Sequence, residues 1–213
     1  MNEFTSWHQD TLGERTVKAL IKNNFGAAYV KTAKEAMDKI LALVPKEATV
    51  GIGGSWTLTE MGMTKALEAR GNTVYDHNKP GLAPEESMAL RRKELTCDVF
   101  MTSANAVTLD GQIVNVDGAG NRVAAMIFGP KKVIIVAGVN KIAKDVADGQ
   151  TRIKLYAAPI NVKRLNRQNP CVQSGECMDC QLPTRICNVT TIMHKKPAVT
   201  DVQVFIVGED LGF

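Results

Sequence analysis

Four cysteines near the end of the chain have a spacing that could hold an inorganic centre. Cys171, Cys177, Cys180 and Cys187 form the pattern C-x5-C-x2-C-x6-C. Four thiolates can bind one tetrahedral zinc ion or one 4Fe–4S cluster. Structural zinc sites usually pair two short C-x-x-C units, and only Cys177–Cys180 is such a unit, so the longer outer spacings favour an iron–sulfur loop. We therefore predict a 4Fe–4S cluster, with zinc and metal-free thiols as the two alternatives.

A glycine-rich turn lies between a predicted strand and a predicted helix. Its ligand-binding candidates are Gly51, Gly53, Gly54 and Ser55. Glycines let the backbone approach a ligand closely, and the free N–H groups and positive dipole end of a helix start favour an anion. The turn has neither the G-x-G-x-x-G nor the Walker A pattern, which argues against the standard dinucleotide and ATP sites. The alternative is a tight turn in which Ser55 or Thr57 only caps the helix.

A second polar block contains two Asp-Gly turns and ends where another helix is predicted to begin. Arg122 would present a planar fork suited to carboxylate or phosphate, and Asn121 would cap the helix. Asp110 and Asp117 are the candidates for acid–base chemistry. The alternative is a β-hairpin whose Asp and Asn side chains satisfy their own turns. The ligand-binding candidates in this block are Asn105, Asn115, Gly118, Gly120, Asn121 and Arg122.

The elements that would position these residues alternate between helix and strand. Two capping boxes, Thr32–Glu35 and Thr57–Glu60, mark helix starts. The predicted helices span 10–24, 32–44, 57 onwards, 84–95, 121–128, 140–148 and 158–167. The predicted strands span 48–52, 73–75, 98–102, 132–137, 188–193 and 202–207, with a hairpin over 106–117. This alternation predicts a three-layer α/β fold, a mostly parallel sheet with helices on both faces, whose ligands bind at the carboxyl ends of the strands.

Composition limits the classes of protein that fit. The 213 residues suit a single domain over 1–213, with the cysteine-rich segment 169–188 as an insertion within it. The basic stretches Arg91–Lys93 and Lys163–Arg167 have no aromatic stacking platform, so we interpret them as solvated helix faces and expect no nucleic-acid partner. The start of the chain lacks a secretory apolar region, and no run is long enough to span a membrane. We therefore expect a cytoplasmic protein with reduced cysteines, among which Cys97 belongs to the core.

Three segments, 51–63, 102–142 and 177–188, resemble the LUD, or lactate-utilisation, domain family. The resemblance covers nearly the whole chain. It implies a fold like that of the ribose-phosphate isomerase and CoA-transferase superfamily, with Gly51–Ser55 as the anion-binding first turn and residues 105–122 as the second binding loop. It also implies that the protein occurs together with an iron–sulfur oxidoreductase system that oxidises lactate to pyruvate. Neither glycine-rich loop carries the nucleophilic Glu of CoA-transferases, which argues against acyl-CoA transfer.

Three functions follow from these patterns. The first is an iron–sulfur redox accessory or subunit in organic-acid oxidation that binds a small anionic ligand. The second is a metal-free enzyme, isomerase-like or transferase-like, acting on a phosphorylated or carboxylated small molecule. The third is a non-catalytic scaffold whose cysteine loop binds a partner protein. Association with iron–sulfur oxidoreductase subunits and assembly into a homo-oligomer are further expectations.

Overall fold

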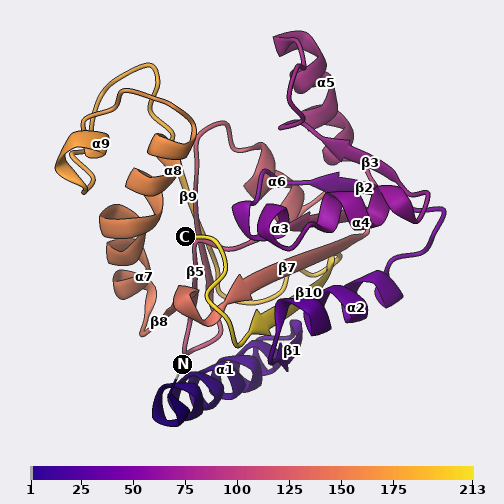
Figure 1. Ribbon diagram of the computed structural model, residues 1–213, viewed down its shortest axis with the longest axis vertical. Coiled ribbons are helices and arrows are strands. Elements are labelled where there is room, and N and C mark those ends of the chain that lie inside the picture. The colour runs from indigo at the N-terminus through magenta and orange to yellow at the C-terminus, as the bar shows by residue number, and fades with distance from the viewer. Residues whose placement is uncertain (1) are drawn as a thin grey trace.

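The computed structural model, which describes residues 2–213, is built on a sheet of six parallel strands (Figure 1). The order across the sheet is β1-β10-β7-β4-β2-β3. The strands are β1 (Gly26–Val30), β2 (Thr49–Ile52), β3 (Thr73–Asp76), β4 (Val99–Thr102), β7 (Lys132–Gly138) and β10 (Asp201–Val207). All five neighbouring pairs are parallel, so their carboxyl ends meet at one edge.

Helices cover both faces of this sheet, which confirms the predicted three-layer α/β fold. The helices around it are α1 (Glu3–Lys22), α2 (Ala33–Leu43), α3 (Trp56–Glu60), α4 (Met63–Ala69), α5 (Pro84–Glu94) and α6 (Asn121–Ile127). One core cluster joins α2, α3 and α4 to one face, and a second joins α1 and α6 to the other. Figure 1 shows α1 and α2 on either side of β1 at the bottom of the molecule.

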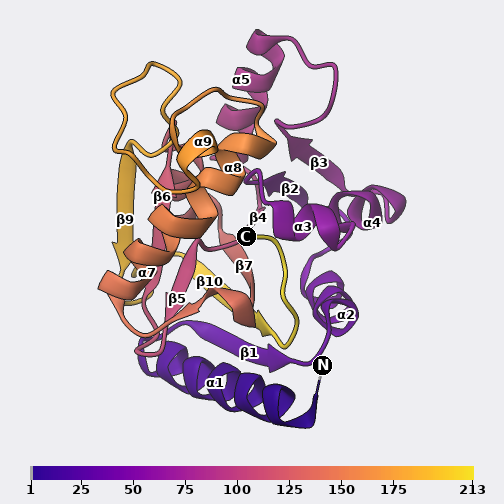
Figure 2. The same cartoon turned by 60° about the vertical axis from the view of Figure 1, so that its left-hand side comes forward.

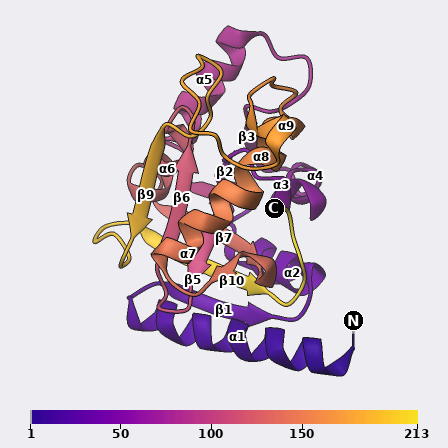
Figure 3. The ribbon, with the colours of Figure 1, turned by 90° about the vertical axis from the view of Figure 1, so that its left-hand side faces the viewer.

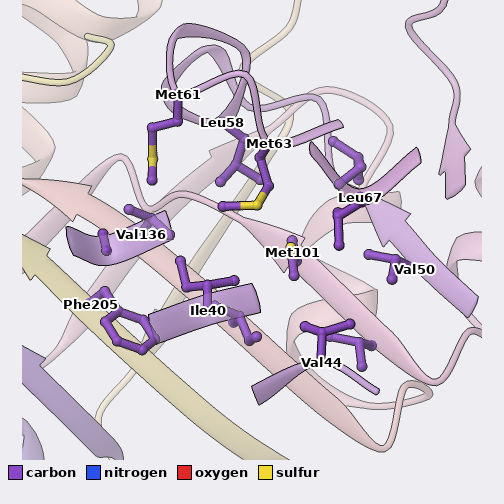
Figure 4. Packing of buried hydrophobic residues seen from close by; sticks show 14 of the residues in the cluster. Ile40, Val44, Val50, Leu58, Met61, Met63, Leu67, Met101, Val136 and Phe205 are labelled. Carbon is purple, nitrogen blue, oxygen red and sulfur yellow. The ribbon is translucent and has the colours of Figure 1, made fainter. Parts of the chain in front are cut away.

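Strand β7 shows why the sheet lies between two cores. Ile134 and Val136 belong to the first cluster, whereas Val133, Ile135 and Ala137 belong to the second. Because side chains alternate along a strand, a continuous apolar run is required when both faces are buried. Figure 4 shows the first cluster, in which α2 and α4 pack their apolar side chains against the central strands.

A second sheet of four strands lies beside the first, in the order β8-β5-β6-β9. Its strands are β5 (Ala106–Thr108), β6 (Ile113–Asp117), β8 (Ile142–Ala143) and β9 (Val189–Met193). One side of this sheet packs on the second core cluster, and the other is covered by a continuous helical segment (Figures 2 and 3). That segment consists of α7 (Val146–Arg152), a π-helical turn (Ile153–Ala157) and α8 (Ala158–Arg164). The sequence predicted the β5–β6 hairpin but not the sheet that it joins.

One predicted capping box is confirmed and the other is wrong. Thr32 caps α2 by accepting a hydrogen bond from Glu35 N, and the Glu35 carboxylate accepts one from Lys31 N. The predicted capping box Thr57–Glu60 does not form. Ser55 caps α3 instead, and the Glu60 carboxylate accepts a hydrogen bond from the backbone of Gly212. The capping box does not form because the Glu60 carboxylate is already engaged by Gly212, which is distant in sequence.

Two further predictions differ from the structure. The helix predicted over 140–148 is a 3₁₀ turn at Val139–Lys141, followed by β8, and α7 begins only after its cap Asp145. Pairing of β8 with β5 decides this region, and that pairing is tertiary. The edge strand β1 was not predicted, because Gly and Ala at its start weaken the strand pattern. No helix within residues 2–213 has the length and apolar character needed to cross a lipid bilayer.

Candidate functional site

A large cleft opens at the carboxyl ends of the central strands. The strand order reverses between β2 and β4, the place where sheets of this type bind ligands. The cleft has a volume of about 610 Å³, within the range of small-molecule sites. One wall comes from α5 and the other from α8 and the cysteine segment, which stand on opposite sides in Figure 1. Both loops singled out in the sequence contribute to its lining.

The first glycine turn lines the cleft, but the backbone N–H groups of Gly53 and Gly54 are already engaged. Gly53 N donates to Met101 O and Gly54 N donates to Ile52 O. The helix that follows has five residues, so it offers little dipole for an anion. Gly51 lies within β2, where a side chain would meet the Cys97 sulfur at 2.9 Å. Gly51 is therefore a packing residue, and the helix-start argument for anion binding does not hold here.

Arg122 is fully engaged within the protein. Its Nε donates to Asp117 at 2.9 Å, and its Nη1 donates to the Asn115 side chain at 2.7 Å and to Ser103 O. Its Nη2 donates to the Asn105 side chain at 3.0 Å and to Val116 O. A guanidinium has five N–H donors, so none remains for a ligand. Contrary to the prediction, the Arg122 fork organises the binding loop instead of facing a substrate.

The remaining candidates of this block divide between two places. Asp117 and Gly118 line the cleft, while Asp117 is held by Arg122 and by Val123 N. Asp110 lies at the closed end of the β5–β6 hairpin, where its carbonyl accepts from Asn23, so its position does not support a catalytic role in the cleft. Asn121 is the first residue of α6, not its cap, and its side chain accepts from Arg91. Gly120, in the left-handed region with φ 84°, is the residue that precedes the helix.

Positive charge dominates the cleft. Its lining includes five arginines and Lys141, against the single carboxylate side chain of Asp117 among the described residues. Arg91, Arg164 and Arg167 come from the two basic stretches that the sequence analysis assigned to solvated helix faces, and that interpretation is wrong for these three. Within residues 2–213 none of the three lies within salt-bridge distance of a carboxylate. Arg164 also stacks on the Trp56 ring, 5.6 Å from its centroid.

His77 lines the cleft and is paired with the buried carboxylate of Glu94. His77 follows β3, and its Nδ1 lies 2.7 Å from a Glu94 carboxylate oxygen that also accepts the His77 backbone N–H. Burial raises the pKa of Glu94, while the contact with His77 opposes that shift. The other ring nitrogen lies beside Gly54. The pair therefore fixes the orientation of an imidazole at the glycine turn.

Lys141 is a buried amine at the same edge of the sheet. It follows β7, has only 3% of its surface exposed, and lines the cleft. Its Nζ donates to Thr57 Oγ1 and to Ser103 Oγ, both at 2.9 Å. Burial, and then the charges of Arg152 and Arg122, lower the pKa of Lys141 to about 7.

The four cysteines of the segment line one small pocket. Cys171 begins α9 (Cys171–Ser174) and is buried, whereas the other three are partly exposed on the coil that follows. Asn169, itself 2% exposed, donates to the Cys180 sulfur at 3.5 Å, and its side-chain oxygen has no hydrogen-bond partner. The structure thus brings together four residues separated by up to sixteen positions, and all four are free thiols.

The π-helical turn fastens this segment to the rest of the protein. In a π-helix the carbonyl of Lys154 would accept from residue 159, but Pro159 has no N–H. The Lys154 carbonyl instead accepts from Cys177 N at 2.9 Å. A local irregularity of the helix therefore sets the position of the central cysteine.

The four sulfurs surround a small cavity and are not grouped as ligands of a single metal ion would be. Within the part of the chain that the structure describes, no three His, Cys, Asp or Glu side chains are grouped to hold a single metal ion. The space between the four thiols is about 20 Å³, roughly that of one water molecule, and it adjoins a cavity of about 330 Å³ that Cys177 and Cys187 also line. Burial, and then the neighbouring thiols, raise the pKa of Cys171; burial and Cys177 raise the pKa of Cys187 to about 11.

Arg185 joins the cysteine pocket to the cleft. It lines both, together with Ile186. Its guanidinium donates to Cys180 O at 2.7 Å and to Cys187 O at 3.1 Å, and it pairs with Asp179 at 2.7 Å. Asn188 donates to Gly118 O, so the cysteine segment also rests on the second binding loop. The two candidate regions are therefore neighbours.

Comparison with known proteins identifies the family. A model of the LUD domain matches residues 13–207. The chain belongs to the LUD domain family. A similar solved structure is the crystal structure of a DUF162 family protein from Deinococcus radiodurans, with a TM-score of 0.54 and 14% identity. That match covers 93% of this chain and 98% of the other, and at this identity it shows the fold alone. No protein of curated function matches the sequence.

This LUD domain contains candidate site residues that sequence reasoning missed. Lys141, His77 and Glu94 were not selected, although Lys141 follows the clearest buried strand of the chain by three residues. A charged residue just beyond a buried parallel strand was the signal available for it. His77 likewise follows β3 directly. Nothing in the sequence indicates that Glu94, on a polar helix, turns inward.

Proposed function

We propose that this lactate-utilisation-type protein of the LUD domain family is an iron–sulfur redox accessory or subunit in organic-acid oxidation. Cys171, Cys177, Cys180 and Cys187 would hold a 4Fe–4S cluster, and the neighbouring cleft would bind a small anionic ligand. The observation that carries the proposal is the position of Arg185, which lines both the cysteine pocket and the cleft.

The residues present fit such a cluster better than a single ion. Zinc holds its thiolates about 2.3 Å away, which demands sulfurs much closer together than a cluster does. The cysteines here surround a pocket without forming a group of that kind. Asn169 already donates to one sulfur, and Arg185 places positive charge beside Cys187, as a negatively charged centre requires. The cluster would supply one-electron transfer.

Loading would require the segment to widen. The space of about 20 Å³ is too small for a cluster core, and residues 173–176 and 181–184 are exposed. Cys171 and the backbone of Cys177 are the fixed points, the first through burial and the second through its hydrogen bond to Lys154 O. Movement of the exposed stretches would then adjust Cys180 and Cys187. Because bound thiolates must lose their protons, loading would release protons and favour a higher pH.

The charge of the cleft supports an anionic ligand. Arg91, Arg164 and Arg167 approach it from α5 and from the end of α8 without a carboxylate partner of their own. A ligand carrying phosphate or carboxylate would supply the missing negative charge, and guanidinium groups bind such oxygens in pairs. Arg122, whose donors are all in use, would keep the binding loop in shape and would not contact the ligand.

The cluster is tested by oxygen-free preparation and reconstitution. We expect four irons and four sulfides per chain, as in any 4Fe–4S centre, together with broad visible absorption. Cys180→Ser should lose most of this iron, whereas Cys97→Ala should retain it, because Cys97 lies in the core beside Glu94 O. A colourless, iron-free protein after reconstitution would refute this part of the proposal.

The cleft is tested separately by calorimetry with inorganic phosphate. Arg91→Ala should weaken binding by about 1.5–3 kcal/mol, the range for hydrogen bonds to charged groups. Arg92→Ala is the matched control, because Arg92 is adjacent in sequence but exposed and absent from the cleft. Equal affinities of the two variants would argue that the cleft arginines do not bind the anion.

A further inference from the structure

The buried amine of Lys141 has no part in holding a cluster, yet it lies in the cleft without a counter-charge. Within residues 2–213 no carboxylate lies within salt-bridge distance of its Nζ. Its neighbours of like charge, Arg152 and Arg122, lower its pKa more than the carboxylate of Glu60, which acts from a greater distance than a salt bridge, raises it. A lysine desolvated beside other cations is the environment that produces a nucleophilic amine.

The hydrogen bonds of Nζ favour the uncharged form. An ammonium carries three N–H donors, but among the residues that the structure describes it donates to only two acceptors, Thr57 Oγ1 and Ser103 Oγ. The charged form would leave one buried donor unpaired, which is costly. A neutral amine uses both of its N–H groups on these two oxygens and keeps its lone pair free.

We infer that Lys141 forms a reversible imine with the carbonyl carbon of a small anionic aldehyde or ketone bound in the cleft. This inference names the substrate class of the proposed cleft and rests on its anion binding, but it does not depend on the cysteines. The arginines would hold the carboxylate or phosphate of the compound, while its carbonyl group reaches the amine beside Ser103.

The step balances without any oxidant or reductant. The lone pair of Nζ attacks the carbonyl carbon, a C–N bond forms, and the carbonyl oxygen takes up a proton. The nitrogen gives up its two protons in all, one to the carbonyl oxygen in the first stage and one to the resulting hydroxyl group in the second. That group leaves as water when the C–O bond breaks, and the nitrogen lone pair completes the C=N bond of the imine. The hydroxyl groups of Ser103 and Thr57 contact Nζ and each other, the latter at 3.4 Å, so they can carry protons during both stages.

The test is reductive trapping with cyanoborohydride, which delivers hydride to an imine and leaves a stable amine. The wild-type protein is incubated at pH 7 with pyruvate, with dihydroxyacetone phosphate, or with uncharged acetone, and adducts are located by peptide mass mapping. With its pKa near 7, about half of Lys141 is unprotonated at this pH, against less than about 0.1% of an ordinary lysine. We expect one adduct, on Lys141, with at least one of the two anionic compounds.

The controls separate this inference from the proposed anion site. Acetone should label Lys141 at least about tenfold less, because it lacks the group that the arginines bind. Lys141→Met should abolish the adduct and Lys144→Met should retain it, since Lys144 is exposed and outside the cleft. Labelling that spreads over surface lysines, or none on Lys141, overturns the inference. If calorimetry still shows phosphate binding in that case, the cleft stands and only the role of the amine has failed.

Discussion

The cleft and the cysteine pocket lie side by side but are built in opposite ways. In the cleft, Arg122 satisfies all five of its donors on groups from two separate stretches of the chain, 103–105 and 115–117. In the cysteine pocket, the only hydrogen bond to a sulfur of the segment comes from Asn169, at 3.5 Å, among the described residues. The cleft is therefore assembled by the protein itself, whereas the cysteine segment has strong ligand groups still unused.

This contrast separates two kinds of functional region. A preorganised loop can bind a ligand without changing shape, because its polar groups are already fixed. A segment of free thiols gains its order from what it binds, and the binding free energy then adds to the stability of the folded state. The contrast predicts that substitutions in the two regions will differ sharply in their effect on the metal-free protein.

The largest effect is expected at Arg122. Arg122→Ala would remove one of the hydrogen-bond donors to the buried Asn115 side chain and leave Asp117 without its charged partner. We expect a loss of about 3–5 kcal/mol in the free energy of unfolding, measured by denaturant titration. Arg92→Ala, on an exposed site, should change it by less than about 0.5 kcal/mol. A small effect at Arg122 would show that the loop does not depend on this network.

A smaller, pH-dependent effect is expected at Lys141. Its pKa is lowered in the folded protein to about 7, from an ordinary value near 10.5, so above pH 7 the unfolded chain binds the extra proton. Stability contributed by this residue should therefore rise with pH between about 7 and 10, by up to about 1.4 kcal/mol per pH unit. Unfolding of wild type and Lys141→Met, compared across this range, isolates the slope. Parallel pH profiles for the two proteins would contradict the buried, unpaired amine.

The smallest effect is expected in the cysteine segment without metal. Cys177→Ser and Cys180→Ser should each change the free energy of unfolding by less than about 0.5 kcal/mol, because both side chains are partly exposed and hold nothing in place. After reconstitution the wild-type protein should melt at a higher temperature than before, and the two variants should not. Large losses in the metal-free variants would mean that the thiols already support the fold.

The sequence allowed the fold and the two loops to be predicted, for physical reasons that are local. Buried strands such as β7 are recognisable from an unbroken apolar run, and the Asp110–Gly111 hairpin from its turn residues. The same local reasoning could not tell which of two adjacent arginines faces the cleft. Arg91 faces the cleft and Arg92 faces solvent, and only the packing of α5 decides which.

The sequence also could not show the protonation state of the candidate site residues, or whether their hydrogen-bonding groups are already engaged within the protein. Arg122 looked like a free fork because its acceptors on Asn105 and Ser103 lie seventeen and nineteen residues away along the chain. Glu94 and Lys141 gain their altered pKa values from burial, which no local pattern reports. Tertiary structure thus changed which residues are candidates for ligand binding, while the candidate cleft lies at the carboxyl ends of the strands.

Electron paramagnetic resonance of the reduced, reconstituted protein tests the central claim most directly, that a cluster on the four cysteines lies beside an anion-binding cleft. We predict a cluster signal that changes when saturating phosphate is added, with a midpoint potential that becomes more negative, because an added anion near Arg185 disfavours reduction. Absence of a cluster signal, or a signal that phosphate leaves unchanged while calorimetry shows phosphate binding, would contradict the account.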